Sequence, residues 1–168
     1  MAETTDLSRE RRDLIQTLDK HRGFLRQTLD GMSYDQIRLT STVSQLSLGS
    51  VVKHVTATET TWRKFIEKGA AAFDEMSPDA YEAEWRLEES DTVESLLDAY
   101  ARAAAETDAL AAVVDLDSEH ELPVAPWFEP GAAWSGRRCL LHIIAEGAQH
   151  AGHADIIREA IDGAKTMG

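Results

Sequence analysis

Four long stretches with apolar residues at helical spacing constrain the fold of this chain more than any other feature. In the first stretch, Leu14, Leu18 and Leu25 recur at intervals of four and seven residues, which places them on one face of a helix. The predicted helices cover residues 7–29, 48–68, 92–114 and 136–161. Four amphipathic helices predict an all-α protein built as a four-helix bundle.

Residues typical of helix ends flank these stretches. Ser47 is expected to be the N-cap of the second helix, and Gly69 follows its end. Gly31 stands where a left-handed cap would close the first helix. Asp91, with Glu94 three residues later, resembles a capping box for the third helix.

Two long connections join the predicted helices. Residues 69–90 have room for one short helix of their own, and residues 115–134 hold three of the four prolines and two of the four tryptophans. The second connection is too apolar for a disordered linker, so we expect it to fold over the bundle. No strand pattern of useful length stands out, and the connections predict a bundle with long crossovers.

Composition limits the class of protein. The chain of 168 residues predicts a single domain over residues 1–168, and its net charge of -13 disfavours binding to nucleic acid or to an anionic membrane surface. Cys139 is the only cysteine, which excludes an intrachain disulfide. The N-terminal stretch lacks an apolar run of the signal-peptide type, and no stretch approaches the roughly 18 apolar residues of a membrane span. We therefore expect a cytoplasmic protein.

The segment HIIAEGAQHAGHADIIRE, which begins at residue 142, carries a line of side chains that can bind metal. At about 100° per residue, His142 and His150 lie about 40° to either side of Glu146. His153 lies about 20° from Glu146, and Ile157 falls on the same line. The acidic side chains near the end of the segment lie roughly opposite, so this line is expected to face the bundle interior.

Glu146 and His150 are four residues apart, so their side chains project from successive turns on one side of a helix. That spacing suits two ligands of one metal ion, while a simple Glu–His hydrogen bond is the alternative. A third ligand must come from elsewhere, and His54 lies on the flank of the apolar stripe of the second helix. Taken alone, His54 is more typical of a partly buried core histidine. Together, two histidines and one carboxylate leave coordination positions open, as catalytic metal sites require.

The stretch LGSVVKHVTATE, followed about 90 residues later by HIIAEGAQHAGHADIIREAIDG, resembles the DinB/YfiT-like superfamily. The nearest likeness is to its actinobacterial mini-circle branch, which the segment EWRLEESDTVESLLDAY also resembles. The resemblance covers most of the chain. It implies a four-helix bundle of the DinB type that holds a divalent metal ion, with zinc or nickel expected.

The resemblance also implies which residues hold the metal. The family's triad is one histidine in the second helix and two ligands four residues apart in the last helix, which correspond here to His54, Glu146 and His150. Glutamate at the middle position is similar to the mycothiol-dependent maleylpyruvate isomerase branch, but we expect no second domain and do not expect that specific reaction. The usual ending H-R-G-Q appears here as HAGH. His153 is therefore expected beside the site rather than among the ligands.

Some relatives are described as transferases of low-molecular-weight thiols, so the resemblance implies a metal-dependent S-transferase or isomerase that uses a mycothiol-type thiol on small electrophiles. His153 and His142 are expected to relay protons, and Trp127 and Trp134, with Phe128, to line an apolar pocket for the substrate. Plain core packing of these aromatic rings is the alternative. A non-catalytic metal-binding bundle with a stress-linked interaction role also stays open, as does a homodimer.

Overall fold

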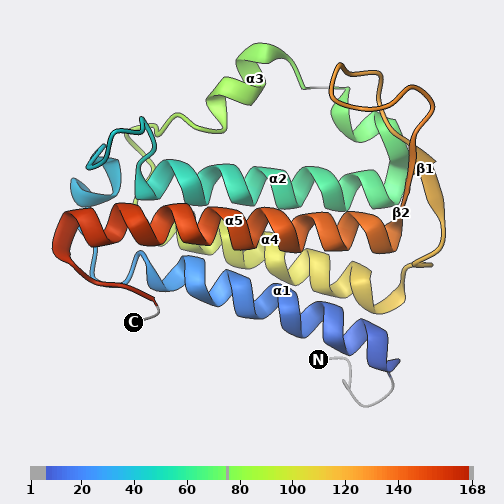
Figure 1. The fold of residues 1–168 in the computed structure, drawn as a ribbon, viewed down its shortest axis with the longest axis horizontal. Helices are drawn as coiled ribbons and strands as arrows, with labels where there is room; N and C mark the ends of the chain where they lie inside the picture. Colours follow the sequence, from blue (N-terminus) through green and yellow to red (C-terminus); the bar gives the residue numbers. More distant parts are fainter. Residues whose placement is uncertain (1–6, 75, 167–168) are drawn as a thin grey trace.

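The computed structural model describes residues 7–74 and 76–166. Residues 1–6, which belong to the stretch expected to lack a signal peptide, lie outside the described part. Four long helices lie alongside one another as a bundle (Figure 1). They are α1 (Arg9–Gln27), α2 (Leu48–Lys68), α4 (Val93–Val113) and α5 (Gly136–Asp162). The predicted all-α bundle and the approximate positions of its four helices are confirmed.

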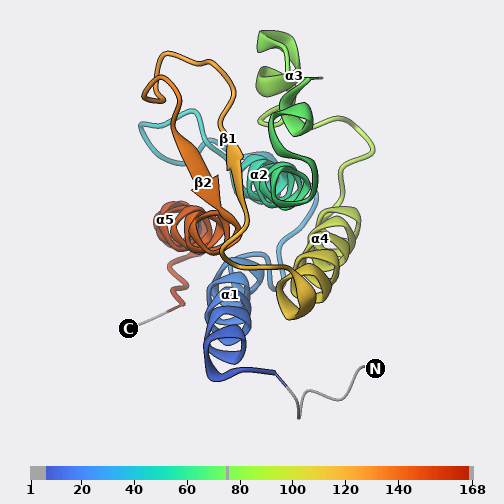
Figure 2. The same ribbon diagram turned by 90° about the vertical axis from the view of Figure 1, so that its right-hand side faces the viewer.

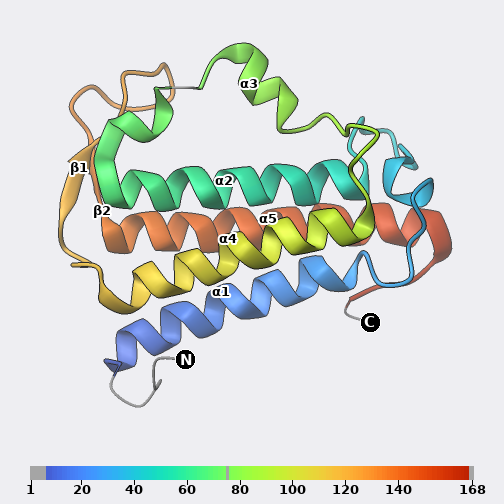
Figure 3. The ribbon, with the colours of Figure 1, turned by 180° about the vertical axis from the view of Figure 1, so that it is seen from behind.

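Helices that follow one another in the chain are not always neighbours in space. α1 packs against α4 and α5, and α2 packs against the same two helices. In the view along the bundle, α1 therefore stands diagonally across from α2 (Figure 2). Seen from behind, α4 lies between α2 and α1 (Figure 3). The connections from α1 to α2 and from α4 to α5 each cross a diagonal of the bundle. Of the two long connections expected from the sequence, residues 115–134 cross in this way, while residues 69–90 join the neighbouring helices α2 and α4.

Most helix ends agree with the predicted caps. Ser47 caps α2 by accepting a hydrogen bond from the Ser50 N–H, and Gly69 follows the helix with a φ of 64°. α1 ends earlier than predicted, with Thr28 as its C-cap. Gly31 still adopts the left-handed conformation, with a φ of 72°, but in the turn that follows the helix.

The capping box predicted for the third helix of the bundle is wrong by one residue. The N-cap of α4 is Thr92, and its hydroxyl accepts a hydrogen bond from the Ser95 N–H. The Ser95 hydroxyl accepts one from the Thr92 N–H in return. Asp91 is not the cap because its carboxylate accepts a hydrogen bond from Lys53 Nζ, 2.7 Å away on α2.

Short elements occupy the connections. They are η2 (Gln36–Arg38), η3 (Gly69–Phe73), α3 (Pro78–Ala83), β1 (Glu119–Glu121) and β2 (Ala133–Ser135). α3 lies above α2 (Figure 1), and β1 pairs antiparallel with β2 so that His120 stands opposite Trp134. The two strands were not expected, because three residues are too few to show the alternation that marks a strand.

One group of buried ions interrupts the largely apolar interior of the bundle. The Arg22 guanidinium on α1 donates hydrogen bonds to Glu59 Oε2 on α2 (3.3 Å) and to Asp108 Oδ1 on α4 (2.8 Å). The Arg22 and Glu59 side chains are only 3% and 2% exposed. This group ties three of the four helices together. None of the helices in the described ranges is long and apolar enough to cross a membrane.

Candidate metal centre

His54, Glu146 and His150 lie together where α2 faces α5. One potential ligand atom of each residue lies within 4.8 Å of the others. Both histidines are buried and Glu146 is partly buried. The helical pattern explains why these residues face inward. Val51 lies on the same side of α2 as His54, Ile157 lies on the same side of α5 as Glu146, and the two are 0% and 3% exposed. The line of side chains on α5 therefore does face inward.

Glu146 lies between two histidines of its own helix. Its Oε2 is 3.5 Å from His150 Nε2, and its Oε1 is 3.6 Å from His142 Nε2. The contact with His150 lowers the pKa of Glu146 below its usual value although the carboxyl is partly buried, which keeps it ionised at neutral pH. Burial lowers the pKa of His142, an effect that the charge of Glu146 only partly offsets.

Residues of the 69–90 connection contact His54. The Trp85 ring stacks on the His54 imidazole with centroids 3.7 Å apart and planes 15° apart. Glu84 Oε2 lies 3.3 Å from His54 Nδ1, and Thr58 Oγ1 lies 3.3 Å from His54 Nε2. The close carboxylate is not aligned for a hydrogen bond, so Nδ1 is a buried polar atom that has no hydrogen-bond partner among the described residues. Such an atom is costly to leave unsatisfied.

The donor set fits a divalent transition metal. Imidazole and carboxylate ligands suit zinc and nickel, and three protein ligands leave a position for a substrate. Ligand atoms held 2.0–2.2 Å from one zinc ion can lie at most about 4.4 Å apart, so the observed cluster needs only a small side-chain adjustment to close on an ion. An ion bound at His54 Nδ1 would also give this buried atom a partner.

The other predicted residues of α5 lie around the cluster in different ways. His153 Nδ1 is 3.4 Å from His150 Nδ1, so His153 contacts a candidate ligand from behind. His142 lies on the opposite side of Glu146 and faces the adjoining cavity. Cys139 is fully buried, and burial raises the pKa of its thiol to about 12. Its thiol is therefore unsuited to act as a nucleophile.

A cavity of about 690 Å³ opens beside the cluster, and His54, His142 and Glu146 all contribute to its wall. Trp127, from the loop between β1 and β2, also lines it. Trp134 is not among the lining residues. Its ring stacks behind the wall on Trp62, with centroids 4.8 Å apart and planes 18° apart. The two tryptophans expected to line one pocket thus have different positions.

The 69–90 connection supplies residues that we did not predict from the sequence. Tyr81 and Glu84 line the cavity, and Trp85 stacks on His54. Ser77 followed by Pro78 at the start of a helix is a pattern that could have located α3, since Ser caps helices and Pro favours the first turn. Nothing in the local sequence indicates that α3 lies over α2.

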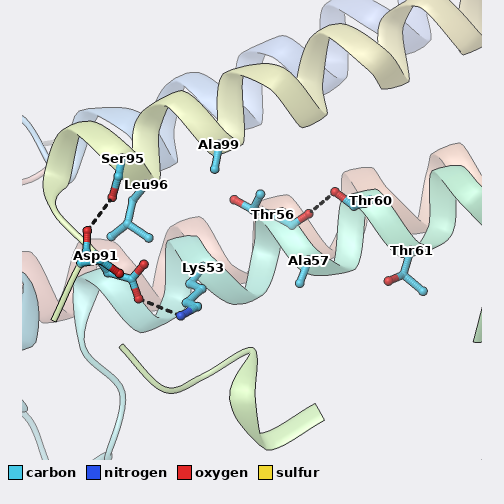
Figure 4. A pocket seen from close by; sticks show the side chains of 10 residues that line it. Lys53, Thr56, Ala57, Thr60, Thr61, Asp91, Ser95, Leu96 and Ala99 are labelled. Carbon is cyan, nitrogen blue, oxygen red and sulfur yellow. Dashed lines mark hydrogen bonds and ion pairs between the residues drawn. The ribbon is translucent and has the colours of Figure 1, made fainter. Parts of the chain in front are cut away.

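A second hollow, of about 530 Å³, lies between α2 and α4 (Figure 4). The Lys53 ammonium there is already paired with Asp91 at 2.7 Å. The hydroxyls of Thr56 and Thr60 donate hydrogen bonds to carbonyl groups of their own helix. Because these polar groups already have partners within the protein, this hollow is a weaker candidate for a functional site than the cavity beside His54.

Comparison with known proteins identifies the family. Residues 13–163 match the model of the family described as "Mycothiol-S-transferase". The fold is similar to that of a solved structure described as a conserved protein from Enterococcus faecalis, with a TM-score of 0.61 and 16% sequence identity over 91% of this chain and 97% of that chain. A comparison with curated proteins found no match. Since the family model covers nearly the whole bundle and both parts of the candidate metal centre, the chain belongs to the mycothiol S-transferase family, a DinB/YfiT-like family.

Proposed function

We propose that this protein is a metal-dependent transferase that joins a low-molecular-weight thiol of the mycothiol type to a small electrophile. The observation that carries the proposal is the position of His54, Glu146 and His150, whose potential ligand atoms gather within 4.8 Å at the wall of a 690 Å³ cavity. A cavity of this size lies in the range of sites for small molecules. The family match supports a thiol as one of the two substrates.

The three residues would hold zinc or nickel and leave a coordination position open to the cavity. A divalent ion held there would lower the pKa of a bound thiol and so favour the thiolate, which is the reactive nucleophile. His142, which lies at the cavity wall 3.6 Å from Glu146, would accept the thiol proton. His153 contacts His150 and would hold that ring in position rather than touch the substrate.

With a haloarene as the electrophile, the bond changes balance without another reactant. A bond forms between the thiol sulfur and the ring carbon as the carbon–halogen bond breaks. The halide leaves with the electron pair of that bond, and the thiol proton passes through His142 to water. The products are a thioether, a halide ion and a proton.

Metal content and thiol conjugation, measured on the same preparation without an affinity tag, test this proposal. The wild-type protein should hold about one divalent ion per chain and should conjugate mycothiol with chlorodinitrobenzene. His150→Ala should lose the ion and the activity together. His21→Ala is the matched control, because His21 lies on α1 outside the cluster. Metal retained by a variant with alanine at all three positions would refute the metal centre.

His153→Ala separates a supporting role from ligation. Loss of a group that supports a ligand typically costs about 10- to 100-fold in metal affinity or activity, so this variant should keep most of its metal at saturating concentration. If His153→Ala loses metal as completely as His150→Ala, His153 is a fourth ligand and the site is closed to substrate. A wild-type protein that binds metal firmly and conjugates no thiol would favour a non-catalytic metal-binding role.

A further inference from the structure

The exposed side of α5 carries no charged group over most of its length. Between Arg138 and Glu159, the exposed residues of this helix are Leu141, Ala145, Gln149, Gly152 and Ile156. At about 100° per residue, all of them lie within about 50° of one line along the helix. The carboxylates and the guanidinium of this stretch belong to partly buried residues, namely Glu146, Asp155 and Arg158. We call the exposed set, with Arg138 and Glu159 at its two ends, the outer face.

Two large apolar side chains stand on this outer face. Leu141 and Ile156 are 46% and 62% exposed. In Figure 1 no other described segment crosses in front of α5 between its ends, and Figure 2 shows α5 at one corner of the bundle. Single exposed apolar residues are ordinary, but an uncharged face of this length is unusual in a chain with 28% charged residues. The outer face therefore has the character of a contact surface.

Gly152 has no packing role within the monomer. A Cβ at this position would meet no atom of the described residues within 4 Å. Glycine is the least favourable residue in a helix interior apart from proline. Small residues at a helix contact let two helix axes approach closely, because the distance between the axes depends on the side chains that meet. Gly152, with Ala145 two turns before it, gives the outer face a flat centre on which a second helix can lie.

We propose that a second copy of this chain docks on the outer face, with the two α5 helices antiparallel about a twofold axis that passes between the levels of Ala148 and Gln149. In this register Leu141 lies opposite Ile156 of the second copy. Ala145 lies opposite Gly152 of the second copy. Each contact occurs twice, because a twofold interface is self-complementary. The dimer does not depend on the proposed transferase function, since the outer face is turned about 110° around the helix from Glu146.

The charges at the two ends of the outer face select the antiparallel direction. The antiparallel register places Arg138 opposite Glu159 of the second copy at both ends of the contact. A parallel pair about a twofold axis would place each of these residues opposite its own copy, and like charges repel. The Arg138 guanidinium stacks over the Trp134 ring, 4.2 Å from its centroid, which leaves the N–H groups at its edge able to donate. Glu159 lies 3.3 Å from Lys165 on the surface, where both side chains are about half exposed.

The expected affinity follows from the size of the contact. At 1.5 Å per residue, the outer face is about 30 Å long. One helix pair of this length buries less than the standard interface of about 1,600 Å², so the association should be weak, with a Kd of about 1–100 µM.

Sedimentation velocity on the full chain, over a concentration series that brackets about 10 µM, tests the dimer. The sedimentation coefficient should rise from the value of a monomer to that of a dimer. Leu141→Asp should weaken association at least about 100-fold, because the twofold axis buries the new carboxylate in both halves of the contact. Val113→Asp is the matched control, because Val113 is 78% exposed on α4, diagonally across the bundle from α5. A chain that stays monomeric throughout, or a dimer that Leu141→Asp weakens no more than the control does, would refute the proposal.

Exchange of the end charges tests the antiparallel direction. Arg138→Glu alone should weaken association about tenfold, because it sets like charges opposite each other at both ends. Arg138→Glu combined with Glu159→Arg sets opposite charges facing each other again and should return the Kd to within about threefold of the wild-type value. A double variant that associates as weakly as Arg138→Glu would overturn this register.

Gly152→Gln tests the close approach of the two helices. In the monomer the new side chain enters open space, so the urea midpoint in dilute solution should be unchanged or higher. In the dimer the same side chain would collide with Ala145 of the second copy, and association should weaken at least about tenfold. Association as strong as that of the wild type would exclude close packing at the centre of the outer face.

Discussion

The buried ion group of Arg22, Glu59 and Asp108 gives a sharp prediction for stability. Arg22→Met removes the guanidinium that donates hydrogen bonds to the Glu59 carboxylate. The Glu59 side chain, which is only 2% exposed, then has no charge partner. Removing one partner of a buried ion pair typically costs about 3–5 kcal/mol, because the remaining charge is left in a medium of low polarity. The Asp108 side chain is 35% exposed and can be hydrated, so the loss of its pairing with Arg22 adds little to the cost in unfolding free energy.

The expected order of stabilities follows from which charge each variant leaves behind. Glu59→Leu should cost less than Arg22→Met, because Arg22 keeps Asp108 at 2.8 Å. The double variant Arg22→Met/Glu59→Leu should also be more stable than Arg22→Met alone, since it leaves no unpaired charge in the core. Arg9→Met is the control, because the Arg9–Asp13 pair is 82% and 55% exposed and pairs of this kind contribute only about 0.3–0.5 kcal/mol.

Urea unfolding followed by circular dichroism measures these differences. For a chain of this length, 3–5 kcal/mol corresponds to a decrease in Tm of about 6–20 °C. If Arg22→Met were no less stable than the Arg9→Met control, the ion group would not hold the three helices together. A double variant less stable than Arg22→Met would also contradict the reasoning, because the stranded Glu59 charge would not then be the main cost.

Two further predictions concern single groups. Cys139 is fully buried, and burial raises the pKa of its thiol to about 12. A disulfide exchange reagent at about pH 8 should therefore react with one thiol per chain in urea and with almost none in the native protein. Rapid reaction of the native thiol would contradict this burial. Burial opposes the ionisation of Asp91, but hydrogen bonds from Lys53 and from the Glu88 N–H outweigh it and lower its pKa. Stability from this pair should therefore be complete above the unfolded-state pKa of about 3.9 and should be lost as the pH falls through the lower, folded-state pKa. Asp91→Asn should flatten this acid dependence in urea midpoints measured between about pH 5 and 2.5, and an unchanged slope would contradict it.

The sequence alone determined the helices and the inward line of α5. Helical periodicity is a local property, since residues three or four apart share one face whatever surrounds the helix. The apolar spacing around Val51 and Ile157 was therefore enough to indicate that His54 and His150 face the interior. Residue types alone offered His54 only as a candidate third ligand, and the resemblance to a family implied that it belongs with Glu146 and His150, because spacing within one helix says nothing about which helix lies opposite.

Only the tertiary structure decided what surrounds that cluster. Whether Asp91 caps α4 or pairs with Lys53 depends on the distance between α2 and α4, and the ion pair prevails. The place of Glu84 against His54 depends on how the 69–90 connection folds over α2, and no local pattern reports it. Trp127 and Trp134 both belong to the 115–134 connection, but they have different positions. The pairing of β1 with β2 holds Trp134 against Trp62, whereas Trp127, in the loop between the strands, lines the cavity. These arrangements arise from contacts between segments far apart in the chain, where packing and charge pairing decide among choices that local preferences leave equal.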